Sequence, residues 1–197
     1  MAKLYKKILC LSFMLVLITS LIGCSAVNEF KEGFNDGLEK SKSKSEGELT
    51  DKVIKSSDGN TQITVKSDWE ESPDLNGEAS MQVNNMVKEK YAIVISEPIE
   101  DFAEDITVDE YSNMCKEILL ESIKNSKISD VTDTTINGQP AKYYEIKGEV
   151  DKIKICYFIA NIKGKKGLHQ VIGWTINSKY DENKEEIKKV VQSFKEL

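Results

Sequence analysis

The run from residue 153 to residue 162 constrains the fold most, because residues 155–159 read Ile-Cys-Tyr-Phe-Ile and are apolar on both faces of an extended chain. A strand with one face in water alternates apolar and polar residues, whereas a strand buried on both faces is a short continuous apolar run. We therefore expect a central strand with helices on both of its faces. That arrangement is a three-layer α-β-α sandwich.

Turn signals on either side of this run predict its neighbours in the sheet. Asn137-Gly138 is the strongest hairpin signal in the chain and joins a strand at residues 131–136 to one at residues 141–147. Gly164-Lys165-Lys166-Gly167 then turns the chain into a strand at residues 168–176. Four apolar residues of that strand share one face: Leu168, Ile172, Trp174 and Ile176.

The first part of the domain predicts three short strands. Residues 61–66 alternate, Met81 and Val83 repeat the pattern, and residues 91–96 form a third run that Pro98 ends. Strands that follow one another in this way favour a mainly antiparallel sheet.

Two amphipathic segments predict long helices. Thr107 and Glu110 form a capping box, and the helix that they open is expected to end near Asn125. Its expected buried residues are Val108, Tyr111, Met114 or Cys115, Ile118 and Leu119. A second helix at residues 180–194 is expected to bury Tyr180, Ile187, Val190, Val191 and Phe194. Antiparallel strands with two long helices predict a single α+β domain at residues 51–197.

The N-terminus has the order of a secretory signal peptide, because three lysines precede an apolar segment that closes at Leu21-Ile22-Gly23-Cys24. This tetrapeptide resembles the lipobox of bacterial lipoproteins, in which the cysteine receives a diacylglyceryl group and becomes the first residue after cleavage. The resemblance implies a signal peptide at residues 1–23, a lipidated Cys24, and a chain held on the outer face of the cell membrane. Two acyl chains give stable anchoring.

Two points at the N-terminus stay open. Residues 8–28 carry no charge and are long enough to cross a bilayer, so an uncleaved anchor is the alternative, with the same topology. Residues 24–50 are expected to be a flexible tether. Within this tether, Gly33 and Gly37 favour a frayed leader. A short interfacial helix is the alternative. The apolar side of that helix would be Val27, Phe30, Phe34 and Leu38.

Charge excludes one class of partner. Removing residues 1–23 removes three lysines and no acidic residue, which leaves 24 lysines against 33 acidic residues and a net charge of −9. A surface this acidic argues against nucleic acid as the partner. The chain also has no arginine, so no guanidinium group can hold a phosphate or a carboxylate through two parallel hydrogen bonds.

Few residues offer chemistry. His169 is the only histidine, it falls on the strand face opposite Trp174, and we expect it to be an ordinary strand residue. Cys115 and Cys156 each lie in an apolar pattern, which favours core packing over a disulfide. A zinc site would need both thiols and His169 to meet at one point. The chain has no catalytic motif, so we expect neither enzyme activity nor a cofactor.

One stretch is dense in acidic residues, with seven carboxylates between residues 97 and 110. Calcium prefers carboxylate oxygens, and five residues form a candidate cluster: Glu97, Glu100, Asp101, Glu104 and Asp105. The alternative is a solvated loop whose last acids, Asp109 and Glu110, interact favourably with the first turn of a helix. Because the spacing of a calcium-binding loop is absent, the solvated loop is the preferred interpretation.

Four passages occur in order across residues 58–197. They are Ser67-Asp68-Trp69, Thr107-Val108-Asp109-Glu110-Tyr111, Ile136-Asn137-Gly138-Gln139-Pro140-Ala141 and Ile187-Lys188-Lys189-Val190-Val191-Gln192-Ser193-Phe194. Their order and spacing resemble the Mog1/PsbP-like superfamily, in particular the PsbP-related exported or lipid-anchored proteins of bacteria. The resemblance implies a non-enzymatic protein that binds or helps to assemble other complexes, with no catalytic residue to transfer.

Three classes of function remain. The leading expectation is a binding or assembly module on the outer face of the membrane that engages a protein partner. A carrier of a lipid or another apolar ligand is the second and would need a deep apolar pocket. A hydrolase is the third and would need a polar cleft around His169.

Overall fold

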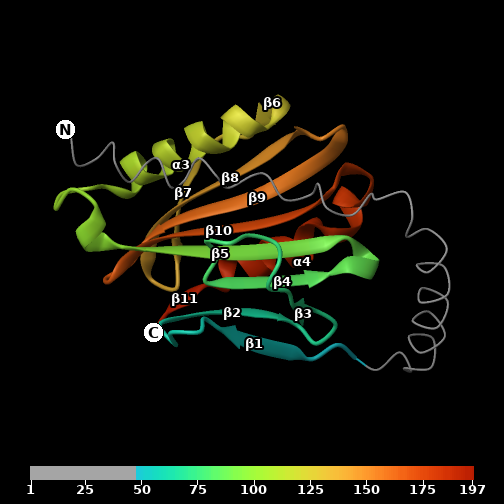
Figure 1. Ribbon diagram of the computed structural model, residues 1–197, viewed down its shortest axis with the longest axis horizontal. Helices are drawn as coiled ribbons and strands as arrows, with labels where there is room; N and C mark the ends of the chain where they lie inside the picture. The colour runs from blue at the N-terminus through green and yellow to red at the C-terminus, as the bar shows by residue number, and fades with distance from the viewer. Residues whose placement is uncertain (1–47) are drawn as a thin grey trace.

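The computed structural model describes residues 48–197, so the predicted signal peptide, Cys24 and the candidate helix at residues 27–38 lie outside the described residues. The described chain forms two sheets and two helices, which confirms the α+β class (Figure 1). The smaller sheet has the order β1-β2-β11, with β1 at Asp51–Lys55, β2 at Thr61–Lys66 and β11 at Lys195–Glu196.

The larger sheet is antiparallel and has the order β3-β4-β5-β10-β9-β8-β6, with β7 also pairing with β8. Its strands are β3 (Glu70–Glu71), β4 (Met81–Asn85), β5 (Lys90–Pro98), β6 (Lys124–Ile128), β7 (Thr132–Ile136), β8 (Gln139–Val150), β9 (Ile153–Lys163) and β10 (Gly167–Ile176). The helices are α3 (Val108–Ser122) and α4 (Tyr180–Gln192), with single 3₁₀ turns at Met86–Lys88, Ile99–Asp101 and Asn177–Lys179. Within the described residues, no helix is both long and apolar enough to cross a bilayer.

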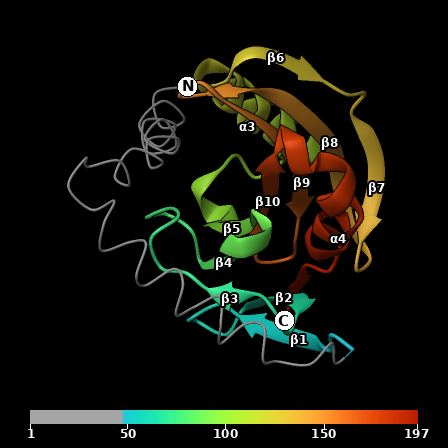
Figure 2. The same ribbon diagram turned by 90° about the vertical axis from the view of Figure 1, so that its right-hand side faces the viewer.

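Strand β9 is central, as its apolar run predicts. It pairs with β10 on one side and with β8 on the other, and residues 155–162 are all buried. Ile155, Tyr157 and Ile159 pack in a cluster with α3, whereas Cys156 and Phe158 pack in a cluster with α4. The two helices therefore lie against opposite faces of the large sheet (Figure 2).

The small sheet packs on the α4 side of the large sheet. The sequence patterns did not predict this second sheet. Ile63 and Val65 of β2 join the same core cluster as Ile187 and Phe194. Strand β11 holds the end of the chain in this layer, because Lys195 pairs with Gln62 of β2. The C-terminal residues therefore complete a sheet that the first described strands began.

Helix α3 begins as predicted and ends earlier than predicted. The capping box is present, since Thr107 Oγ1 accepts a hydrogen bond from the Glu110 N–H and the Glu110 carboxylate accepts one from the Thr107 N–H. The predicted end near Asn125 is wrong, because Ile123 already has extended backbone and Asn125 lies within β6. Gly148 of β8 leaves room for the Ile123 side chain at the end of the helix, since a Cβ at residue 148 would lie only 2.2 Å from Ile123 Cγ2.

Two hairpins in the large sheet have two-residue turns. Asn137 and Gly138 have φ of 49° and 80°, the left-handed values that such turns favour, and the predicted hairpin is confirmed. The turn between β8 and β9 has the same character without a glycine, because Asp151 and Lys152 have φ of 48° and 70°.

Candidate functional site

The face of the large sheet beneath α3 carries a row of three polar side chains from adjacent strands. Lys142 of β8 pairs with Asn161 of β9, and Asn161 pairs with Gln170 of β10. Residues opposite each other in antiparallel strands point to the same face, so their side chains cross the sheet in a line. The three residues are 8, 0 and 2 % exposed. We call Lys142, Asn161 and Gln170 the polar row.

The N-terminal part of helix α3 packs over the polar row through two polar contacts. Ser112 Oγ donates to Asn161 Oδ1 at 3.2 Å. Lys142 Nζ forms ion pairs with Asp109 of α3 at 2.5 Å and with Asp133 of β7. Lys142 of β8 therefore links β7 and the start of α3 through its two ion pairs.

A second polar contact joins α3 to β5. The Tyr111 hydroxyl donates to Glu97 Oε2 at 2.8 Å. Burial raises the pKa of Glu97, which favours its neutral acid, and burial also raises the pKa of the Tyr111 hydroxyl. Cys115, one turn further along α3, is buried, and burial raises the pKa of its thiol.

Three buried donor atoms on this face have no hydrogen-bond partner. They are Tyr144 Oη, Asn161 Nδ2 and Gln170 Nε2. Tyr144 belongs to β8, lies two residues from Lys142 and is fully buried. We call Tyr144, Asn161 and Gln170, with Ser112 above them, the α3 site. Sequence patterns did not indicate it, because Asn, Gln and Tyr in strands are individually unremarkable and only strand pairing aligns them.

His169 lies on the opposite face of the sheet, as predicted, with its side chain 4 % exposed. Its Nδ1 is 3.0 Å from Ser96 Oγ, and its Nε2 is 3.2 Å from Glu196 Oε1. A carboxylate only accepts hydrogen bonds, so Nε2 carries the proton and the Ser96 hydroxyl donates to Nδ1. Burial lowers the pKa of His169, which keeps the ring neutral.

The series Ser96, His169 and Glu196 connects the same residue types as a catalytic triad, but its surroundings are those of an anchor. The Glu196 carboxylate is 5 % exposed and accepts three further hydrogen bonds, from the backbone N–H groups of Lys165 and Lys166 and from Gln139 Nε2. These contacts hold the last strand, β11, against the turn between β9 and β10. The imidazole of His169 is therefore buried between Ser96 and the strand that ends the chain.

The two thiols cannot form the disulfide or the zinc site considered above. Cys115 packs in the cluster beneath α3, and Cys156 packs in the core cluster beneath α4, so the large sheet separates them. Both are free and buried. His169 lies on the same face as Cys156, and within residues 48–197 no three potential metal ligands come together.

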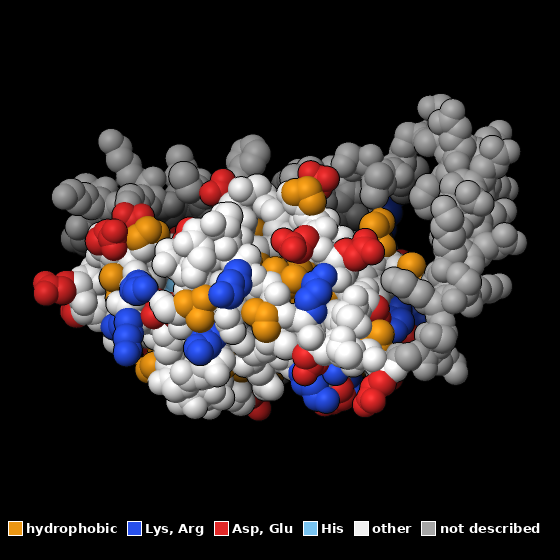
Figure 3. Space-filling model, turned by 90° about the horizontal axis from the view of Figure 1, so that it is seen from below, with side chains coloured by type: hydrophobic (Ala, Val, Ile, Leu, Met, Phe, Trp, Pro, Cys, Tyr) orange, Lys and Arg blue, Asp and Glu red, His pale blue; other side chains and the backbone are white. Residues whose placement is uncertain are grey.

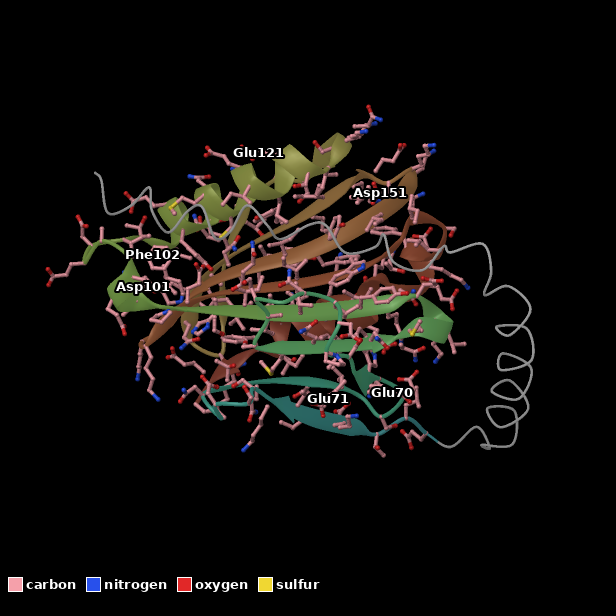
Figure 4. The ribbon with its side chains drawn as sticks, viewed as in Figure 1. Glu70, Glu71, Asp101, Phe102, Glu121 and Asp151 are labelled. Carbon is pink, nitrogen blue, oxygen red and sulfur yellow. The ribbon has the colours of Figure 1, made fainter. Side chains whose placement is uncertain are left out.

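The carboxylates of the acidic stretch bind different partners. Glu97 binds Tyr111, Asp109 binds Lys142, and Glu110 completes the capping box of α3. In Figure 4, Asp101 lies on the loop before α3 next to Phe102, whose ring meets Tyr111 edge-on with centroids 5.8 Å apart. The described structure does not bring the five candidate calcium ligands into one group.

A buried ion pair on the α4 side escaped sequence analysis altogether. Lys90 of β5 is fully buried, its Nζ lies 2.6 Å from Glu186 Oε1 of α4, and it lies over the Trp69 ring. The Trp69 indole N–H donates to the same Glu186 oxygen at 2.7 Å. Asp68 lies 3.8 Å from Lys90. Burial alone would raise the pKa of Asp68, but the hydrogen bond from Lys88 and the positive charge of Lys90 outweigh burial and lower this pKa.

Comparison with known proteins supports the fold. No family model and no curated protein matches the chain. The solved structure of cyanobacterial PsbP (CyanoP) from Synechocystis sp. PCC 6803 matches 78 % of this chain and 96 % of its own, with a TM-score of 0.56 and 11 % sequence identity. LpqN, involved in cell envelope biogenesis of Mycobacterium tuberculosis, matches 75 % of this chain and 91 % of its own, with a TM-score of 0.52 and 10 % identity. The described domain therefore has a PsbP-like fold.

Proposed function

We propose that this protein is a lipid-anchored, non-enzymatic binding or assembly module on the outer face of the cell membrane, and that its partner is a protein. The lipobox-like Leu21-Ile22-Gly23-Cys24 supports the anchor. In this proposal the large sheet is the middle layer of a three-layer PsbP-related domain. LpqN, which shares the fold, is described as involved in cell envelope biogenesis, and this agrees with a role at the envelope.

The observation that favours a protein partner is the open edge of the large sheet at β6 and β7. Residues 124–135 are all exposed, and both strands pair only with β8 among the described strands. Figure 2 shows them along the outside of the sheet. The face in Figure 3, by contrast, carries small hydrophobic areas separated by charged side chains. An open strand edge can bind a partner through main-chain hydrogen bonds, without a large apolar patch.

The two edge strands differ in protection. Strand β6 has an irregularity between Lys124 and Lys127, and Asn125 there has φ of 52°, devices that discourage pairing with another chain. Strand β7 has regular pairing through all five residues. In a hairpin with a two-residue turn, alternate pairs are hydrogen-bonded, so the N–H and C=O groups of Asp133 and Thr135 point outward. We propose that the partner adds a strand to β7.

Substitution at Thr135 tests this surface. Thr135→Pro removes an outward N–H and leaves the bonds to β8 in place, so the fold should persist while strand addition fails. A photo-crosslinking amino acid at Thr134 in intact cells should capture one protein, and Thr135→Pro should abolish the adduct whereas Thr135→Ala should retain it. The same crosslinker at exposed Val53 of β1 is the control. Equal adducts at both positions would contradict a partner surface on β7.

The anchor has a separate test. Cys24→Ala should prevent labelling by a radioactive fatty acid and leave the precursor uncleaved. Labelling that persists in the variant would contradict lipidation at this residue.

A second candidate is a carrier of a lipid or another apolar ligand. The observation that favours it is the α3 site, where buried donors without partners adjoin apolar side chains.

A further inference from the structure

The α3 site contains half of the unpartnered buried side-chain atoms in the described structure. Tyr144 Oη, Asn161 Nδ2 and Gln170 Nε2 share one face of the sheet, whereas Thr61 Oγ1, Asp68 Oδ1 and Gln139 Oε1 lie elsewhere. Their residues are 0, 0 and 2 % exposed. Buried polar groups in native proteins almost always have a partner, so these three donors point to a hydrogen-bond acceptor bound on this face.

Strand pairing places the three donor residues on one face of the sheet. Asn161 is directly opposite Gln170, and Tyr144 is one step along β8 from the residue opposite Asn161. Ser112 of α3 bonds Asn161. The pKa of Tyr144 is raised mainly by burial and secondly by Cys115, which lies one turn after Ser112 in α3. Ser112 and Cys115 of α3 therefore lie close to Asn161 and Tyr144.

The donors specify the chemistry of the occupant. Amide N–H groups and a hydroxyl seek an oxygen acceptor. Lys142, the nearest cation in the row, is already paired with Asp109 and Asp133, so it does not offer its charge to an anion. The adjacent row on the same face is apolar, because Tyr144 is in register with Ile159, and Ile159 with Ile172. The surroundings suit an uncharged oxygen, alone or attached to an apolar group.

We propose that the α3 site binds an uncharged hydrogen-bond-accepting oxygen, held by Tyr144 Oη, Asn161 Nδ2 and Gln170 Nε2. The oxygen belongs either to an ordered water molecule or to the ester carbonyl of a lipid whose apolar part lies along the isoleucine row. This site is separate from the β7 edge, so failure of one proposal does not affect the other.

Conservative substitution in the full chain tests whether the donors are occupied. Tyr144→Phe should raise the unfolding equilibrium constant roughly fivefold, because it breaks a hydrogen bond to the bound oxygen. Tyr157→Phe is the matched control, since Tyr157 lies on the same face and its hydroxyl is neither fully buried nor bonded to another protein group; its constant should change less than twofold. The proposal is overturned if Tyr144→Phe is as stable as the wild type or more stable, because deleting an unoccupied donor relieves desolvation.

Two measurements on the folded wild-type protein then distinguish the sources. A cross-peak between water and the Gln170 side-chain amide in lipid-free protein would show water. A rise in melting temperature with monoolein that disappears in Gln170→Met would show the lipid carbonyl. If neither signal appears, the site has no oxygen ligand and the proposal fails.

Discussion

The two faces of the large sheet differ in which of their buried polar atoms lack a partner. Beneath α4, Lys90 has Glu186 within 2.6 Å and His169 has a partner on each ring nitrogen. Beneath α3, Asn161 and Gln170 each keep an amide nitrogen without a partner. The unpartnered atoms beneath α4 are all oxygens, Thr61 Oγ1, Asp68 Oδ1 and Gln139 Oε1, whereas beneath α3 two of the three are amide nitrogens, which can only donate.

The two faces also differ in what covers them. The α4 face also carries the small sheet and the larger apolar cluster, which includes Phe194 and Trp69. The α3 face is closed by one helix whose contacts include orphan donors. Because an amide nitrogen only donates, Asn161 and Gln170 each lose a hydrogen bond on burial unless an acceptor binds there, as we propose.

Aromatic truncation on the two faces should give the largest effects. Phe194→Ala should destabilise the domain by about 3 to 5 kcal/mol, because the ring is fully buried in the α4 cluster. Trp174→Ala on the α3 face should cost less, because Trp174 is only partly buried and stacks on Tyr91 at 5.3 Å. Urea titration of both variants gives the ranking, and a reversed order would show that the α3 face provides the tighter packing.

The buried ion pair should be nearly as sensitive. Glu186→Ala should cost about 3 to 5 kcal/mol, since it removes the nearest carboxylate from the fully buried Lys90 ammonium group. Lys90→Ala alone and the double variant complete a cycle, and the double variant should lose less than the sum of the two single losses. Additive losses in chemical denaturation would mean that the two side chains are not coupled.

Acid should act on the two faces with opposite signs. The pKa of His169 is lowered by burial, so the unfolded chain binds a proton first and stability falls as pH drops through the unfolded value of 6.5. The pKa of Glu97 is raised by burial above 4.5, so its contribution to stability falls as pH rises through that region. Melting curves from pH 7.5 to 4 should lose the first slope in His169→Gln and the second in Glu97→Gln. A slope unchanged in its own variant contradicts the assignment.

The cap of α3 should give the smallest effect and the most local one. Thr107→Ala should cost about 1 kcal/mol, because it removes the hydrogen bond to the Glu110 N–H. If the α3 face is the looser one, hydrogen exchange should quicken in α3 while α4 keeps its protection. Equal acceleration in both helices would indicate that the two faces open together.

Much of the fold was predictable from patterns within a few residues. The alternation in β2, the continuous apolar run of β9, the Asn137-Gly138 turn and the capping box each depend on near neighbours in the chain. Strand β6 was missed because all five of its residues are exposed and show no alternation. The second two-residue turn was missed because Asp151-Lys152 contains no glycine.

The sequence by itself determined the α+β class, the central strand and the two amphipathic helices, because periodicity and caps act locally. It also contains the lipobox-like Leu21-Ile22-Gly23-Cys24, on which the proposed anchor depends. Only the tertiary structure decided which polar groups have partners. Lys90 and Glu186 are 96 residues apart, and Asn161 meets Gln170 only through strand pairing. The desolvation of a buried group and its compensation depend on such distant neighbours, which no local pattern contains.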